Sequence, residues 1–139
     1  MAIAEKDTLV EQVAILLQRR YNIFTEILNL TNDLLEAEGR KDQVSVGLLL
    51  DMRQESLEKC EENWQELNQL GNNDPADEHY MKRMVFQEPE KIIPRNKMEE
   101  KILDLRIRLL QKIKEVKEKD RILSLNMAQG RSYYSRRNR

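Results

Sequence analysis

Side chains that could carry out chemistry are few in this sequence and lie apart. The single cysteine, Cys60, falls on an apolar stripe, where a thiol usually fills space in a core. The single histidine, His79, follows Asp77 and Glu78 at a predicted helix start, where acidic residues favour the helix dipole. A two-metal helical bundle needs inward Glu-x-x-His pairs, which this sequence does not have. We therefore predict no catalytic residue, no metal site and no cofactor, and expect a protein that is not an enzyme.

Two charged residues interrupt the apolar stripes of the predicted helices. Arg53 lies between Leu49 and Leu57, and Asp120 takes one stripe position in the last long segment. Arg53 has three interpretations. Its stem can pack at the edge of the stripe while its head stays in water, it can pair with Asp120 across two helices, or it can contact a partner. The sequence favours the first interpretation and leaves the other two open.

Three long segments and one short segment have the residue spacing of α-helices. Apolar residues recur every three or four positions over residues 7–38, 42–70 and 97–129, which predicts three long amphipathic helices. An Asp-Pro pair predicts the start of a short helix over residues 75–86. The inward stripe predicted for the second long segment consists of Val46, Leu49, Leu57, Cys60, Trp64 and Leu67.

Glycine and proline mark the predicted ends of these helices. Gly39 and Gly130 follow the last periodic residues of the first and last long segments, where glycine commonly ends a helix. Pro89 and Pro94 prevent a helix from continuing through the stretch QEPEKIIPRNK. We expect this stretch to be an extended, mobile connection.

Composition and charge favour solvated helices in one domain. Of the 139 residues, 35% are charged and 5% aromatic, a profile of long helices rather than sheets. Residues 1–70 have 7 basic against 14 acidic residues, and residues 99–139 have 12 against 6, so these two parts should attract each other. We predict an all-α fold, an elongated antiparallel bundle of three long helices with coiled-coil-like contacts plus one short helix. This single domain would span residues 1–130, before a basic, disordered tail at residues 131–139.

The sequence gives a simple prediction for the compartment. One cysteine cannot form an intrachain disulfide, which favours a reducing environment. The start MAIAEKDTLVEQ lacks the basic and apolar parts of a signal peptide, and no stretch is apolar over eighteen residues. We expect a soluble, cytoplasmic protein without membrane insertion.

The tail RSYYSRRNR contains four arginines together with Tyr133 and Tyr134. It can be a solvated terminus, a segment that binds a protein, or one that binds nucleic acid through phosphate contacts and stacking. The sequence favours the solvated terminus and does not favour nucleic-acid binding.

Two stretches together resemble a known family. LLEAEGRKDQ ends the first long helix, and VGLLLDMRQESLEK opens the second, with an arginine after a run of leucines. With a long third helix and a Tyr/Arg tail, this arrangement resembles the bacterial flagellar export chaperones of the FlgN and FliT kind. The resemblance implies a non-enzymatic protein that holds the amphipathic terminal helix of a hook-junction or filament-cap protein before export.

The resemblance also suggests where partners would bind. Helix-in-groove recognition would place the exported helix on the apolar row of the third long helix, which consists of Ile102, Leu105, Leu109, Ile113 and Val116. Tyr133 and Tyr134 would contact the export machinery. The alternative is a coiled-coil scaffold protein, possibly a homodimer, whose basic tail contacts nucleic acid.

Overall fold

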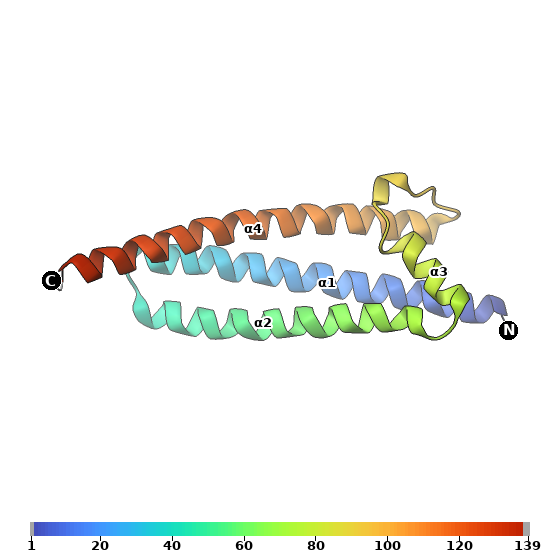
Figure 1. Ribbon diagram of the computed structural model, residues 1–139, viewed down its shortest axis with the longest axis horizontal. Helices are drawn as coiled ribbons and strands as arrows, with labels where there is room; N and C mark the ends of the chain where they lie inside the picture. Colours follow the sequence, from blue (N-terminus) through green and yellow to red (C-terminus); the bar gives the residue numbers. More distant parts are fainter. Residues whose placement is uncertain (1, 138–139) are drawn as a thin grey trace.

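The chain folds into helices, as shown by a computed structural model that describes the backbone of residues 2–137 and the side chains of residues 9–129 (Figure 1). The predicted all-α class is confirmed, and the described part of the chain contains no strand. No helix in this part is long and apolar enough to cross a membrane. The elements are α1 (Ala2–Gly39), α2 (Gln43–Gln69), η1 (Leu70–Asn72), α3 (Pro75–Met84), η2 (Pro89–Lys91) and α4 (Lys97–Arg137).

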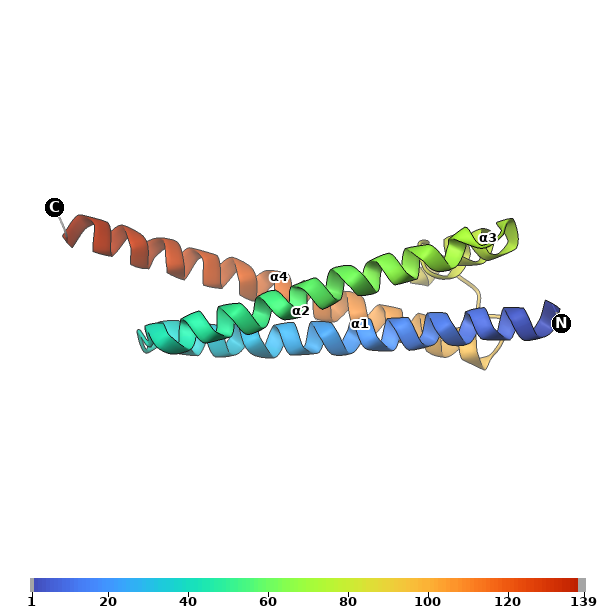
Figure 2. The ribbon, with the colours of Figure 1, turned by 90° about the horizontal axis from the view of Figure 1, so that it is seen from below.

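Helix α1 lies between the other two long helices. It packs along both α2 and α4, whereas α2 and α4 pack little against each other. Helix α2 runs opposite to α1, and α4 runs in the same direction as α1 (Figure 1). Viewed from below, α2 and α4 cross and diverge toward both ends of the molecule (Figure 2). Helix α1 therefore supplies most of the contacts that hold the long helices together.

The core follows from the apolar spacing of α1. Val13, Ile27 and Leu34 are fully buried, and together with their neighbours they form a stripe that contacts both flanking helices. Burying one such side chain contributes about 1.5–3 kcal/mol relative to leaving it in water. A stripe of this width suits a helix with two neighbours, which explains the central position of α1.

The turn between α1 and α2 ends one helix and starts the next within three residues. The amide of Lys41 donates to the carbonyl of Glu38, and the amide of Asp42 donates to that of Ala37. Lys41 takes the left-handed conformation, with φ of 58°. This is the Schellman arrangement, in which glycine usually takes that position. The helix ends at Gly39, as the sequence predicts, but Lys41 rather than Gly39 takes the left-handed position.

Asp42 then caps the start of α2. Its carboxylate accepts from the backbone amide of Ser45 at 3.1 Å and from the Ser45 hydroxyl at 2.6 Å. These two hydrogen bonds hold the pKa of Asp42 below its usual value, and the one from the Ser45 hydroxyl has the larger effect. The short helix begins in a similar way, since Asp74 accepts from the amide of Asp77 and Pro75 follows it, as predicted. Local capping therefore fixes where both helices start.

The connection from α3 to α4 is held at both ends, although the sequence predicts a mobile segment. The Arg106 guanidinium donates to the carbonyls of Met84 at 2.7 Å and Gln87 at 2.6 Å. Arg83 donates to the carbonyl of Ile93 at 3.0 Å. Two arginines thus bind backbone carbonyls at the end of α3 and within the connection.

A buried carboxylate joins this connection to the start of α4. Glu99 is 3% exposed, and its Oε1 atom lies 3.0 Å from both the Arg83 guanidinium and the Arg95 amide. Burial alone would raise the pKa of Glu99, but these hydrogen bonds and the charge of Arg83 outweigh it, so the pKa lies below its usual value. Glu99 is therefore ionised at neutral pH and orders the first turn of α4.

Tyr80 on α3 packs beside this carboxylate. Its hydroxyl is buried and has no hydrogen-bond partner among the residues that the structure describes. Burial, together with the charge of Glu99, raises the pKa of Tyr80 to about 12. The phenol therefore contributes to packing as a neutral group.

The inward row of α2 differs from the predicted one. Ser56 and Asn63 are buried, whereas Leu57 and Trp64, which the sequence assigns to the core, are partly exposed. The observed row alternates steps of three and four without a break, through Val46, Leu49, Arg53, Ser56, Cys60, Asn63 and Leu67. At two of its polar positions, Arg53 and Asn63, the neighbouring helices supply hydrogen-bond partners.

Helix α4 continues past its predicted end. The sequence places the end at Gly130, but the helix runs on to Arg137. A glycine within a helix costs about 1 kcal/mol relative to alanine, and the residues on both sides of Gly130 favour helix. This cost is too small to end α4 at Gly130. Residues 138 and 139 of the predicted tail lie outside the described residues.

Candidate partner-binding surface

The apolar row predicted to bind a partner is part of the core. Ile102, Leu109 and Val116 are buried, and Leu105 and Ile113 are partly buried against the cluster that contains Ile102 and Leu109. These residues belong to the face of α4 that packs on α1. In this arrangement α1 covers the row, so the predicted binding of a partner helix there stays a prediction and would require α4 to move away from α1.

The two charged stripe residues, Arg53 and Asp120, lie together. The Arg53 guanidinium forms an ion pair with the Asp120 carboxylate, and its Nε atom donates to the Thr31 hydroxyl at 3.1 Å. The side chain of Arg53 is 16% exposed and that of Asp120 is 39% exposed. The wet-edge interpretation that the sequence favours is therefore wrong, and Arg53 points into the bundle.

A second arginine occupies the stripe of α1 and contacts α2. Arg20 donates to the Asn63 side-chain oxygen at 3.2 Å, and Asn63 in turn donates to the carbonyl of Leu16 at 2.9 Å. The Arg20 guanidinium carbon lies 5.1 Å from the centre of the Phe24 ring and 5.0 Å from that of Trp64. Cation–π contacts of this kind are attractive, and here they fix the Trp64 ring against α1.

Cys60 lies within reach of Arg20 but has no sign of reactivity. Burial raises the pKa of the Cys60 thiol, and this effect exceeds the opposing one of Arg20. The thiol is therefore protonated at neutral pH and is a poor nucleophile. Among the described residues, no group of three His, Cys, Asp or Glu side chains is placed to hold a metal ion.

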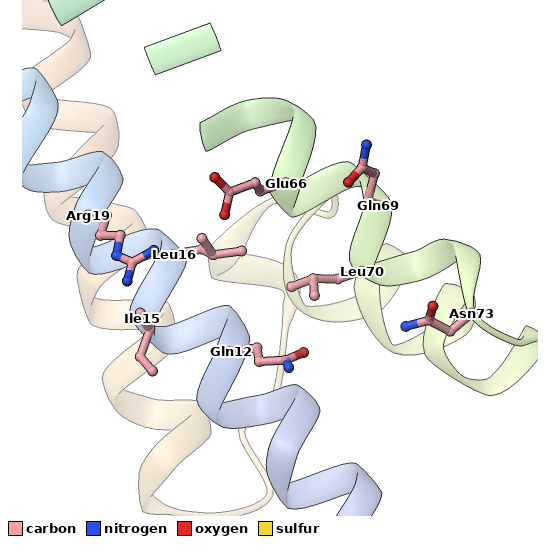
Figure 3. Close-up of a pocket in the computed structure, with 8 residues that line it drawn as sticks. All are labelled: Gln12, Ile15, Leu16, Arg19, Glu66, Gln69, Leu70 and Asn73. Carbon is pink, nitrogen blue, oxygen red and sulfur yellow. The ribbon is translucent and has the colours of Figure 1, made fainter. Parts of the chain in front are cut away.

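An open hollow lies between α1 and α2 near the α3 end of the molecule (Figure 3). It has a volume of about 530 Å³. Leu16 of α1 and Leu70 of η1 point toward each other across it and form an apolar floor. Its other lining residues are Gln12, Ile15, Arg19, Glu66, Gln69 and Asn73. A hollow with an apolar floor and polar walls suits an amphipathic segment better than a small apolar molecule.

The hollow continues along the same two helices. A second one, of about 330 Å³, shares Leu16, Arg19 and Glu66 with the first. It extends the groove toward the middle of the helices, and its remaining lining residues are Asn22, Ile23, Glu26, Lys59, Glu62 and Asn63. The two form one groove, which we call the α1–α2 groove.

The α2 edge of the groove continues beyond the hollows as exposed apolar side chains. Positions that differ by seven residues lie on nearly the same side of a helix, so Met52 follows the line of Lys59 and Glu66. Leu48 lies two such steps before Glu62, with Glu55 at the step between them. Met52 and Leu48 are both exposed. The α2 edge of the groove therefore has two exposed apolar residues toward the α1–α2 turn, Leu48 and Met52.

Ile15 is a groove residue that the predicted stripe does not include. Among the described large apolar side chains of α1, that of Ile15 is the most exposed, at 52%. The sequence contains a signal for this residue, because Ile15 is an apolar residue outside the stripe positions of α1. A lone apolar residue on a polar face is common, so this signal alone does not identify a groove.

The tail residues proposed to contact an export machinery, Tyr133 and Tyr134, lie in α4, but their side chains fall outside the described residues.

The comparisons with known proteins add nothing to the geometry. No protein-family model, no curated protein and no solved structure matches this chain.

Proposed function

We propose that this protein is a non-enzymatic helical binding protein that holds an amphipathic helix of another protein in the α1–α2 groove. Its three long helices act as one elongated bundle with coiled-coil-like contacts. In the narrower form of the proposal, suggested by the family resemblance, the protein is a cytoplasmic export chaperone. Its clients would then be terminal helices of hook-junction or filament-cap proteins.

The observation that supports this function is the composition of the groove. Leu16, Leu70 and Ile15 offer an apolar floor and rim, and the exposed residues Leu48 and Met52 extend the edge. An amphipathic helix can bury its apolar face on these side chains while its polar face stays in water. The α4 row is not needed for this mode, since it remains packed on α1.

The proposal also accounts for the stable polar interior. Arg20, Asn63 and Arg53 tie α1 to α2 through hydrogen bonds, and Asn63 also lines the groove. A groove whose two walls are fixed in this way is formed before a partner arrives. Preformed sites lose less conformational entropy on binding.

A matched pair of substitutions tests the proposal. Ile15 lines the groove, whereas Leu110 lies on α4 outside it, and both are 52% exposed. Ile15→Glu should weaken binding of a client helix, since a buried unpaired carboxylate at an apolar contact is costly, by at least about tenfold. Leu110→Glu should leave binding unchanged. Calorimetric titration with terminal-helix peptides of hook-junction and filament-cap proteins measures the affinity of each variant. Circular dichroism checks that both variants stay helical.

Three results would contradict the proposal. In the first, no such peptide binds the unmodified protein at millimolar concentration. In the second, Ile15→Glu binds as tightly as the unmodified chain. In the third, Leu110→Glu rather than Ile15→Glu loses binding, which would place the binding surface on α4.

A further inference from the structure

We infer that the occupant of the α1–α2 groove is a basic amphipathic helix of another protein, with lysine or arginine flanking its apolar face. This inference rests on the proposed function and adds the chemistry of the partner. It is carried by the charge of the hairpin formed by α1 and α2 and by the way the hairpin already binds α4.

The hairpin is acidic on its outer surface. Residues 9–70 contain twelve acidic and six basic residues, a net charge of −6. Two of the six basic residues, Arg20 and Arg53, turn inward and form hydrogen bonds within the bundle. The acidic residues of α2, in contrast, are all exposed: Asp51, Glu55, Glu58, Glu61, Glu62 and Glu66. A surface of one sign attracts a partner of the other.

The residues that line the groove also include more acidic than basic side chains. Glu26, Glu62 and Glu66 line it, against Arg19 and Lys59. Glu26 lies on α1, and Glu62 and Glu66 lie on α2, so carboxylates line both walls of the groove. They are therefore placed to meet basic side chains on the two edges of a helix whose apolar face lies on the floor.

The hairpin already binds one helix of this kind. Over residues 97–129, α4 has nine basic and six acidic residues, a net charge of +3, and it packs its apolar row against α1. The chain thus contains its own example of a basic amphipathic helix on an acidic hairpin. The groove offers a second surface of similar chemistry between α1 and α2.

A second copy of the chain is a poor occupant. Its basic amphipathic helix would be α4, but Ile102, Leu109 and Val116 of that helix are buried within their own bundle. Releasing α4 from one copy to fill the groove of another would expose that row and its α1 contacts. A helix from a different protein has no such cost.

Three designed helical peptides test the inference. They share one apolar heptad pattern and differ only at the flanking positions, which hold lysine, glutamine or glutamate. Fluorescence anisotropy with the full chain should show the lysine peptide binding at least about tenfold more tightly than the glutamate peptide, a difference expected from a few exposed charge pairs. This preference should shrink when NaCl is raised from roughly 50 mM to roughly 500 mM, because salt screens exposed charges.

A charge reversal in the protein makes the test reciprocal. Glu62→Lys combined with Glu66→Lys should reverse the preference, so that the glutamate peptide binds more tightly. Both residues are exposed, and neither is in one of the ion pairs of the described residues, so the fold should be retained. The matched control is Glu100→Lys with Glu115→Lys on α4, which should keep the preference for the lysine peptide.

Each outcome decides a different question. Equal binding of all three peptides would overturn the inference and leave the proposed function standing. Tighter binding of the glutamate peptide by the unmodified chain would also overturn the inference. Binding of none of them at millimolar concentration would overturn both. A dimer in light scattering that dissociates when Ile15→Glu is introduced would overturn the inference in favour of a second copy.

Discussion

Arg53 on α2 and Asp120 on α4 form an ion pair across 67 residues of sequence. The same guanidinium also donates to Thr31 on α1. One side chain therefore contacts all three long helices. This matters because α2 and α4 pack little against each other, so the ion pair is a specific link between two helices that otherwise share only α1.

Asp120→Ala should destabilise the fold. The substitution leaves the Arg53 guanidinium, whose side chain is 16% exposed, without its carboxylate partner. We expect the free energy of unfolding to fall by about 1–3 kcal/mol, since removing one partner of a largely buried pair leaves the other uncompensated. Urea unfolding followed by circular dichroism measures this loss.

The control for Asp120→Ala is Asp104→Ala. Asp104 pairs with Arg108 on the surface of α4, with both side chains more than half exposed. We expect a change within about 0.5 kcal/mol for this exposed pair. Equal effects of the two substitutions would show that the Arg53 pair contributes no more than a surface pair.

Glu99→Gln should make stability less dependent on pH. The pKa of Glu99 is lowered in the folded chain, so its ionised form stabilises the fold above its usual pKa of 4.5. This contribution is lost as the pH falls through the lower folded value. The difference in unfolding free energy between the original chain and Glu99→Gln should therefore be larger at about pH 7 than at about pH 3. Urea unfolding at both pH values tests this, and a difference that grows on acidification would contradict it.

Tyr80→Phe should leave stability unchanged or slightly raise it. The Tyr80 hydroxyl is buried without a hydrogen-bond partner among the described residues, so its removal loses no hydrogen bond there. Ultraviolet titration of the tyrosinate band should also lose one late transition, because the pKa of Tyr80 is raised to about 12. A clear loss of stability would mean that the hydroxyl has a partner in solution.

Lys41→Gly should stabilise the turn between α1 and α2. Lys41 has φ of 58°, a left-handed conformation that costs a residue with a side chain about 1 kcal/mol and glycine almost nothing. We expect a higher midpoint of thermal unfolding. Lys59→Gly, in the interior of α2, should have the opposite sign, since glycine destabilises a helix by about 1 kcal/mol. A shift of the unfolding midpoint in the same direction for both substitutions would contradict the view that the left-handed conformation of Lys41 is costly.

Much of the helical organisation could be predicted because its signals are local. The start of α3 depends on Asp74 and Pro75, which are adjacent in sequence, and the start of α2 depends on Asp42 and Ser45. The stripe of α1 is apolar at regular spacing, and its members are buried. Signals of this kind depend on hydrogen bonds and periodicity within one turn of helix.

The inward row of α2 could not be predicted, because its polar members depend on other helices. Hydrophobicity alone places Leu57 and Trp64 in the core. Asn63 is buried instead, since Arg20 and the Leu16 carbonyl on α1 satisfy its amide. These partners lie more than forty residues away in sequence, and a pattern of apolar residues does not contain that information.

The sequence is limited in a related way for the candidate site on α4. Periodicity showed that the α4 row from Ile102 to Val116 is apolar on one face, and this is true. It could not show whether another protein or α1 covers that face. The α1–α2 groove, in turn, depends on how two helices lie relative to each other, and Ile15 is its one visible trace in the sequence.

The order of the elements along the chain has a consequence for synthesis. Every residue that lines the α1–α2 groove lies between Gln12 and Asn73, and α1 and α2 are joined by a turn of three residues. Closing a short loop costs less chain entropy than closing a long one, so the hairpin is expected to form before α4 docks. The groove can therefore form during synthesis once the chain has emerged through Asn73, before α4 follows. The face of α1 that receives α4 stays uncovered until α4 has been synthesised.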